Sequence, residues 1–403
     1  MQSTDKAPEY TDDQKVWFEA YEALTEELIK EGSPETQILS PELIEKAQAI
    51  GASVMYFDVL CADEADGPEK LALVLDERIA TTALGKDSGF DSSHRPYGGL
   101  PVFLDRDTME LAWDLGLGEF LLNADGDVHR TQKDVIEVPL RRSAIEGIGA
   151  HVQQLAEETV GKIKRQVGEF DVSPIIREIP FGVMCGLLDI EPESEEAKEL
   201  LELAPEVTNF DGNPLALIRT REIISTIVGE KKIEETGEDA IIMKAVLEAK
   251  NNDKIDEKQT QELFVQIFLA GLESTEALLT NAFIEHVTGV EQNAATVPRV
   301  RRTANRDVVL VDANGVEWSF KNDGAVLIDL YAIDTASTEA DESRPLNFGR
   351  GNHACPGENL AAIQLHLLKQ ALQGLEPTDY SLEEAVAGNS GLSANYQRVV
   401  VRK

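Results

Sequence analysis

The residues best suited to chemistry lie in FGRGNHACPG, residues 348 to 357, which places a histidine and a cysteine among glycines. Three roles are open to the Cys355 sulfur: metal ligand, nucleophile or structural residue. A nucleophile needs a general base nearby, and His353 is the candidate. Side chains two positions apart in a loop tend to diverge, so the histidine alone does not decide between the three roles.

The surroundings of Cys355 favour an ionised sulfur. Gly349, Gly351 and Gly357 allow a tight loop with positive φ, in which another flat group can approach the backbone closely. We expect a helix to begin just after the cysteine, with Pro356 in its first turn. The free N–H groups and the positive end of that helix would stabilise a thiolate.

The other two cysteines suggest no second sulfur site. Three cysteines, at positions 61, 185 and 355, are too few and too far apart for a disulfide framework, and no CxxC pair indicates zinc. Cys185 lies in the apolar run IPFGVMCGLLDI, which predicts a small buried side chain. Cys61 lies beside an acidic loop and supports no role.

A second pattern interrupts the most apolar helical segment, residues 257 to 288. AGLEST, from Ala270 to Thr275, puts a glycine and a Glu–Ser pair into a helix whose apolar side covers more than half its circumference. Glycine inside a helix costs about 1 kcal/mol, and a buried carboxylate at Glu273 also carries a cost. Either close helix packing with Glu273 reaching solvent, or a chemical role, would account for both residues.

These patterns occur in the order typical of the cytochrome P450 (haem-thiolate monooxygenase) family, and the chain resembles that family over about residues 105 to 403. The cysteine stretch resembles its haem-ligand loop, F-x-x-G-x-x-x-C-x-G, and AGLEST resembles its A/G-G-x-D/E-T motif. DGDVHRTQKDV resembles its H-x-x-x-R helix, although His129 and Lys133 alone would indicate only a solvated helix face. RRTANRD resembles the R-T-A-x-x-D strand of bacterial members.

The resemblance implies a role for each matching residue. Cys355 would bind the iron of haem b, and Glu273 with Ser274 or Thr275 would relay protons. Small residues at Ala270 and Gly271 would leave room beside the iron. The remaining haem contacts implied by the motifs are His129, Lys133, Arg302 and His353 at the propionates, and Phe348, Gly349 and Gly357 in the cysteine loop.

The chain also departs from the family's pattern. Lysine replaces arginine at Lys133, which keeps the charge but loses the bidentate fork, and Ser274 replaces the usual threonine. The family's E-x-x-R pair is reduced to Glu291, with Ala294 where arginine should be. A helix is missing ahead of it, and the aromatic–proline meander before the cysteine loop is absent. Losing one partner of a buried ion pair costs several kcal/mol, so something else must brace the loop.

Composition limits the partners. Of 403 residues, 74 are acidic and 37 basic, and the formal charge of −37 repels nucleic acid and anionic membranes. No run of 18 apolar residues occurs, and the N-terminus lacks a basic region followed by an apolar one. We therefore expect a cytoplasmic protein without a membrane anchor.

Hydrophobic periodicity predicts a mainly α protein with a small β portion. The resemblance implies one cytochrome P450-like domain over residues 1 to 403, with the haem between the long central helix and the cysteine loop, and a β-containing N-terminal part and substrate-side loop in residues 1 to 104. Strands are expected at 55–62, 70–76, 306–311, 316–320 and 325–330, with a hairpin-like end. Helices are expected at 14–30, 41–50, 107–117, 127–140, 143–167, 174–188, 194–203, 214–230, 238–250, 257–288 and 358–374.

The implied function is insertion of one oxygen atom from O2 into a small organic substrate. Electrons would come from a ferredoxin or flavodoxin with its reductase, because the chain contains no flavin or iron–sulfur motif. Arg130, Lys133, Arg141 and Arg142 would dock this acidic donor, or else form only a solvated face. The alternatives are a haem-thiolate enzyme driven by peroxide, an oxidative coupler, an isomerase, or a haem-binding protein without catalysis.

Overall fold

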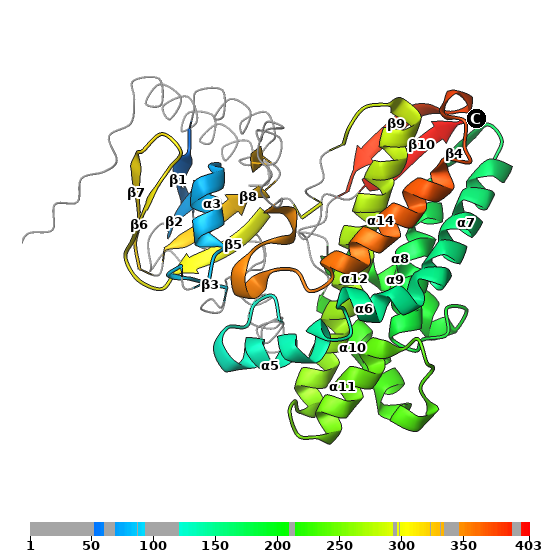
Figure 1. Ribbon diagram of the computed structural model, residues 1–403, viewed down its shortest axis with the longest axis horizontal. Helices are drawn as coiled ribbons and strands as arrows, with labels where there is room; N and C mark the ends of the chain where they lie inside the picture. The colour runs from blue at the N-terminus through cyan, green and yellow to red at the C-terminus, as the bar shows by residue number, and fades with distance from the viewer. Residues whose placement is uncertain are drawn as a thin grey trace, which may run out of the picture. The chain divides into compact units, whose positions relative to one another are not determined.

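The computed structural model describes residues 52–59, 69–86, 88–92, 121–208, 214–292, 296–297, 299–322, 324–330, 332–333, 346–388 and 396–403. The chain divides into two compact units (Figure 1). The first comprises Met1–His94 and Arg299–His353, and the second comprises Arg95–Pro298 and Ala354–Lys403. Each unit is described by itself.

The first unit contains a five-stranded sheet in the order β1-β2-β8-β5-β3. Only β2 and β8 run parallel, and the remaining neighbours are antiparallel. The strands expected near residues 55 and 70 are confirmed as β1 and β2, and the RTA stretch forms β5. The bounds are β1 Val54–Val59, β2 Glu69–Val74, β8 Ala325–Asp329, β5 Arg299–Ala304 and β3 Phe90–Asp91.

A helix, a two-stranded hairpin and two short turns are also described in this unit. Helix α3 (Glu77–Ala83) begins where the Asp76 carboxylate accepts a hydrogen bond from the Ile79 N–H at 2.9 Å, and the sequence patterns did not predict it. Strands β6 (Val308–Val311) and β7 (Glu317–Phe320) form a separate hairpin, confirming two expected strands. Short 3₁₀ turns η5 (Leu346–Phe348) and η6 (Gly351–His353) lead toward the cysteine.

The second unit is a helical bundle in which α7, α8, α12 and α14 lie side by side (Figure 1). Residues 143 to 167, expected as one helix, instead form α6, the 3₁₀ turn η3 and α7. Gly147 and Gly149, at the break, weaken helical continuity. The bounds are α5 Gly126–Glu137, α6 Arg142–Ile145, η3 Glu146–Ile148, α7 Gly149–Arg165, α8 Ser173–Leu187, α9 Glu195–Thr208, α10 Pro214–Glu230, η4 Ile233–Glu235, α11 Ile241–Asn251, α12 Glu257–Thr288 and α14 Glu358–Leu372.

Helix α12 runs through the interior of this unit, as its apolar circumference predicts. Phe264, Phe268 and Phe283 on it are fully buried. Its length and hydropathy would suit a membrane span, but 72% of its most apolar window is buried inside the protein. A capping box between Asp256 and Gln259 starts the helix, and Gly289, with φ +69°, ends it.

The helix expected to be missing between α12 and β5 is absent from the described part of that connection. The described residues between α12 and β5 are 289–292 and 296–297, and none of them is helical. Glu291 is exposed there, whereas Ala294 lies outside the described residues. Most of the segment directly before the cysteine loop, where the family has its meander, also lies outside the described residues. The E-x-x-R brace is therefore not formed by the described part of this connection.

A three-stranded sheet, β4-β10-β9, closes the second unit and confirms the hairpin-like end. The strands are β4 (Glu169–Asp171), β9 (Ser381–Ala387) and β10 (Tyr396–Arg402), with the 3₁₀ turn η7 (Pro377–Asp379) ahead of β9. Val399 and Val401 on the central strand β10 are fully buried in the core beneath.

Candidate functional site

Cys355 is an exposed thiol just ahead of a helix. Helix α14 begins at Glu358 with Gly357 as its N-cap, so Pro356 precedes the cap and is not in the first turn as predicted. Gly357 has φ −83°, which corrects the prediction of positive φ at this glycine. A Cβ added at Gly357 would lie 3.7 Å from the Cys355 sulfur, in ordinary contact.

The two earlier glycines of the loop do adopt positive φ, at +65° for Gly349 and +66° for Gly351. A Cβ on Gly351 would lie 2.6 Å from the carbonyl oxygen of Leu84, at the C-terminal end of α3, and 2.9 Å from the Lys86 nitrogen. Glycine is required here both by conformation and by space. Backbone packing against the end of α3 therefore braces the loop in the first unit.

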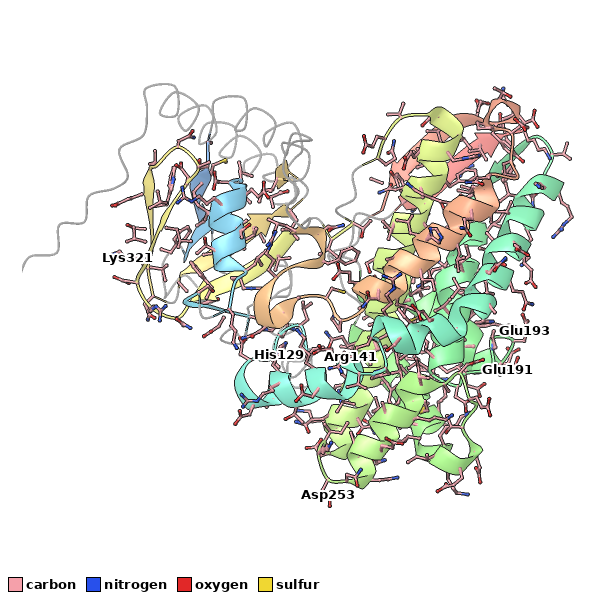
Figure 2. The ribbon with its side chains drawn as sticks, viewed as in Figure 1. His129, Arg141, Glu191, Glu193, Asp253 and Lys321 are labelled. Atoms are coloured by element: carbon pink, nitrogen blue, oxygen red, sulfur yellow. The ribbon has the colours of Figure 1, made fainter. Side chains whose placement is uncertain are left out.

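A second brace comes from α5. Lys133 Nζ donates a hydrogen bond of 3.3 Å to the carbonyl oxygen of Ala354, directly before the cysteine. Burial lowers the pKa of Lys133, while the negative charges of Glu137, Cys355 and Asp134 act in the opposite direction. His129, one helical turn earlier on α5 (Figure 2), is buried at 6% exposure. Lys133 thus holds the cysteine backbone, a contact that the propionate assignment did not anticipate.

The middle of α12 carries an open stripe on an otherwise buried helix. Ala270 is exposed, and Gln266, Gly271 and Ser274 are half-buried. Ser274 Oγ donates a hydrogen bond of 2.7 Å to the Ala270 carbonyl, so both residues share this side of the helix. Thr275 is only 5% exposed and belongs to the buried side. Of the two expected alcohols, Ser274 is the one beside Ala270.

Gly271 is explained by helix packing. A Cβ at this position would overlap the Met184 sulfur of α8 and lie 3.0 Å from its methyl carbon. The missing side chain lets α8 and α12 approach closely. Of the two explanations that the sequence offered, the geometry favours packing against α8 over room beside a cofactor.

Glu273 is buried at 3% exposure and does not reach solvent, which corrects that alternative. The Thr208 hydroxyl at the C-terminal end of α9 donates a hydrogen bond to its carboxylate. No sequence pattern predicts this role of Thr208, because Thr208 lies 65 positions from Glu273 on another helix. Glu276, one turn further along α12, is also buried and pairs with Arg177 of α8 at 2.6 Å.

Four predicted residues belong to the first unit. Arg302 lies on β5, opposite Val326 of β8, and is 5% exposed. Phe348 ends η5 and His353 ends η6, with Gly349 between these turns. The structure therefore places Arg302, Phe348, Gly349 and His353 in one unit. It places Cys355, Gly357, His129, Lys133 and the α12 residues in the other.

The predicted basic cluster is largely paired with acids. Arg130 forms an ion pair with Asp127 and Arg142 with Glu146, in both cases between exposed side chains on one helical surface. Arg141, between α5 and α6, is exposed (Figure 2). Part of the region in which the substrate-side loop is expected, residues 93 to 104, lies outside the described residues.

Comparison with known proteins found similarity to cytochromes P450. No family model matches the chain. The chain is 22% identical over 285 residues to the polyketide biosynthesis cytochrome P450 PksS of Bacillus subtilis (strain 168), covering 64% of this chain and 70% of that protein.

Solved structures agree with this similarity. Cytochrome P450 CYP268A2 of Mycobacterium marinum, in complex with pseudoionone, superposes with a TM-score of 0.72 at 16% identity, covering 90% of this chain and 94% of that one. CYP154A1 from Streptomyces coelicolor A3(2) gives 0.70 at 18% identity, covering 89% and 96%. At such identities the structures establish the fold.

Proposed function

We propose that this chain, which has the cytochrome P450 fold, is a cytochrome P450-type oxidoreductase that inserts one oxygen atom from O2 into a small organic substrate. The observation that carries this proposal is an exposed thiol, Cys355, held ahead of the N-terminus of α14 by contacts to its own loop. We propose that residues 1 to 403 form a single functional domain and that the protein acts in the cytoplasm.

The described residues fit a haem. Cys355 would supply a thiolate ligand, and the small, exposed Ala270 leaves part of core helix α12 open. Both belong to the second unit, where α12 packs against α14. When bound, a haem held by the Cys355 thiolate would supply oxygen activation. We propose haem b, with His129, Arg302 and His353 toward the propionates, Lys133 holding the loop, and Phe348, Gly349 and Gly357 in the loop.

The chain's own residues would supply protons and positioning. We propose that Ser274 presents its hydroxyl on the open stripe and that Glu273 holds a proton behind it, fixed by Thr208. Thr275 is a weaker candidate because it belongs to the buried side. Gly271 supports this arrangement by allowing α8 to pack closely.

We propose a ferredoxin or flavodoxin as the electron donor. The cations on α5 and α6 give a strongly acidic protein a local site for an acidic partner. Only part of this cluster is available, because Arg130 and Arg142 already pair with acids. Docking would then depend mainly on Arg141, and Arg141→Glu should weaken turnover with the donor while leaving substrate binding unchanged.

The substrate class is open to a direct screen. PksS is named for polyketide biosynthesis and CYP268A2 was solved with pseudoionone, so polyketide-like compounds are the first panel that we would test, followed by pseudoionone. Binding would be scored by the shift of the haem Soret band.

The decisive experiment is the spectrum of the reduced, CO-bound protein after reconstitution with haem. We expect the red-shifted band of thiolate-ligated haem in the wild type and in Cys185→Ser. Loss of that band in Cys355→Ser would identify the ligand. A protein that takes up no haem, or a Cys355→Ser variant with an unchanged spectrum, would overturn the proposal.

Because Ser274 replaces the usual threonine, the peroxide-driven alternative also needs a test. Turnover with a donor and NAD(P)H is expected to exceed turnover with peroxide alone. The reverse ratio, together with a Glu273→Gln variant that stays fully active, would favour a peroxide-driven enzyme.

A further inference from the structure

Gln266 on α12 carries an amide group that the proposed function does not use. It is the single polar residue in LFVQIFLAG, residues 263 to 271. Gln266 is half-buried and lies one helical turn before Ala270 and two turns before Ser274, so these residues share the open stripe of the helix. A polar side chain within such an apolar stretch needs a physical reason.

The oxygen of this amide is already engaged. The N–H of Leu121, a buried residue in the turn ahead of α5, donates a hydrogen bond of 2.6 Å to Gln266 Oε1. Because a backbone N–H can only donate, the amide oxygen must face Leu121, and this contact fixes the orientation of the amide group. Pairing a buried N–H explains why an acceptor stands at position 266. It does not explain the amide nitrogen.

The nitrogen, Nε2, has two hydrogens to donate. Among the residues that the structure describes, Gln266 Nε2 has no hydrogen-bond partner, and it is not one of the buried polar atoms that are left unsatisfied. The nitrogen is therefore accessible on the open stripe. An oriented donor on an otherwise apolar surface is the kind of group that fixes the position of a small ligand.

The other residues of the stripe offer no second side-chain donor. Ser274 has one hydroxyl hydrogen, and it is donated to the Ala270 carbonyl at 2.7 Å. Ala270 and Gly271 have no polar side-chain atoms. The stripe therefore presents a donor at Gln266 and, about 6 Å further along the helix axis, an apolar surface at Ala270.

We propose that Gln266 is a specificity-determining residue that donates a hydrogen bond to a carbonyl oxygen of the substrate, while the apolar part of the substrate lies along Ala270. A carbonyl oxygen accepts two hydrogen bonds and brings no hydrogen of its own, so it matches an amide nitrogen with two free hydrogens. The substrate class is a small, mostly apolar ketone or related carbonyl compound. The proposal rests on the proposed function in one respect, namely that the stripe faces the substrate side of the haem.

The test compares ketones with hydrocarbons of the same carbon skeleton. The probes are benzylacetone with butylbenzene, and cyclooctanone with cyclooctane, and isothermal titration calorimetry measures their binding to the full chain with and without haem. Removing the amide hydrogens should weaken ketone binding about three- to tenfold relative to hydrocarbon binding, the effect of one hydrogen bond. A ketone affinity that is no higher in the wild type than in the variants at position 266 overturns the proposal.

Two variants separate the donor from the structural contact. Gln266→Glu keeps an acceptor for the Leu121 N–H and nearly the same shape, but it loses both amide hydrogens. Gln266→Met has no N–H or O–H at any pH, so it excludes a protonated glutamate acting as the donor. Both should lose the preference for the ketone.

Gln261→Glu is the matched control. Gln261 is half-buried on the same helix, five positions earlier and on a different side, and its Nε2 donates to Ser225 Oγ at 2.9 Å. The substitution introduces the same change of amide to carboxylate away from the stripe. We expect this variant to keep the wild-type ratio of ketone to hydrocarbon affinity.

The carbonyl stretch of the bound ketone gives a readout that a merely structural role of Gln266 would not move. In the wild type and in Gln261→Glu, difference infrared spectroscopy should show this band at lower frequency, because the carbonyl accepts a hydrogen bond. In Gln266→Glu and Gln266→Met the band should move back up. The same band position in all four proteins would reject the hydrogen bond.

The two proposals fail separately. If haem binds with a thiolate CO spectrum but neither the affinity ratio nor the carbonyl band responds to position 266, Gln266 is only structural and the proposed function stands. If no haem binds but the ketone band still responds to position 266, the proposed function fails and Gln266 remains a carbonyl-binding residue.

Discussion

At the scale of single residues, one absent methyl group sets the distance between α8 and α12. Gly271→Ala would push against Met184, and overpacking of this kind costs about 1–3 kcal/mol. Replacing a helical glycine by alanine stabilises the helix by about 1 kcal/mol. We expect a net loss of about 1 kcal/mol in the free energy of unfolding, measured by urea titration.

The double variant Gly271→Ala, Met184→Ala serves as the control, because it removes the overlapping side chain. The alanine at 271 should then be neutral or stabilising relative to Met184→Ala alone. An unchanged penalty in the Met184→Ala background would mean that the glycine is needed for something other than packing against α8.

Gly351 allows a similar test in the cysteine loop. Gly351→Ala would place a methyl group against the backbone of Leu84, which cannot move aside as a side chain can. Gly315→Ala is matched in conformation, with φ +83°, but has open space around it. Both variants carry the left-handed strain of about 1–2 kcal/mol.

We expect Gly351→Ala to unfold at lower urea concentration than Gly315→Ala and to bind haem more weakly. Equal midpoints and equal haem affinity in the two variants would show that packing against α3 does not brace the loop.

At the scale of elements, the contact between α8 and α12 makes stability depend on pH. Burial raises the pKa of Glu276 in the folded protein to about 7, whereas the ordinary pKa of a glutamate is 4.5. Between these values the folded state binds more protons than the unfolded state, so stability falls as pH rises. A difference of this size corresponds to about 3 kcal/mol.

Glu276→Gln should remove that pH-dependent part. The stability of the wild type relative to this variant is expected to fall by about 3 kcal/mol as the pH rises from about 4.5 to 7. Chemical denaturation at several pH values measures this difference. The control is Glu262→Gln, at a fully buried glutamate of α12 that pairs with Arg221 at 3.4 Å. A constant difference across this range would contradict the assignment.

The elements that the sequence predicted best are those with local signals. Residues 214–230 and 257–288 were predicted as the helices α10 and α12, with the bounds that the structure gives. Periodicity and capping residues act within a few positions, so they can be read from the chain. Helix α3 was missed because it is only seven residues long, and strand β4 because it is three.

The site was predictable only in part, for a physical reason. The cysteine, its glycines and the acid on α12 stand in motifs, so their residue types were visible. Thr208, Arg177 and Met184 act through contacts with residues far along the chain, and no local pattern marks such partners. Glu276 did leave a signal, since a second acid three positions after Glu273 in an apolar helix requires compensation.

At the scale of the whole molecule, charge is the dominant property. With 74 acidic and 37 basic residues, repulsion among like charges opposes the compact state. Salt shortens the range of this repulsion, from about 30 Å at 0.01 M to about 3 Å at 1 M. We expect the midpoint of thermal unfolding to rise with sodium chloride over this range.

Sucrose at matched osmolarity would be the control, because it stabilises proteins without screening charge. A rise in Tm with salt no larger than that with sucrose would mean that self-repulsion contributes little. A fall with salt would indicate that attractive surface pairs, such as Arg219–Glu199, outweigh the repulsion.

The central place of β10 in its sheet affects how the protein is made. Chains emerge from the ribosome N-terminus first. Strand β4 therefore cannot pair until β10, more than two hundred residues later in the sequence, has been synthesised. The valines that fill the core lie on β10, which follows the other described elements of the second unit in the sequence. The second unit can therefore complete its core only after β10 has been synthesised, and chains stalled before β10 would expose apolar surface to chaperones and proteases.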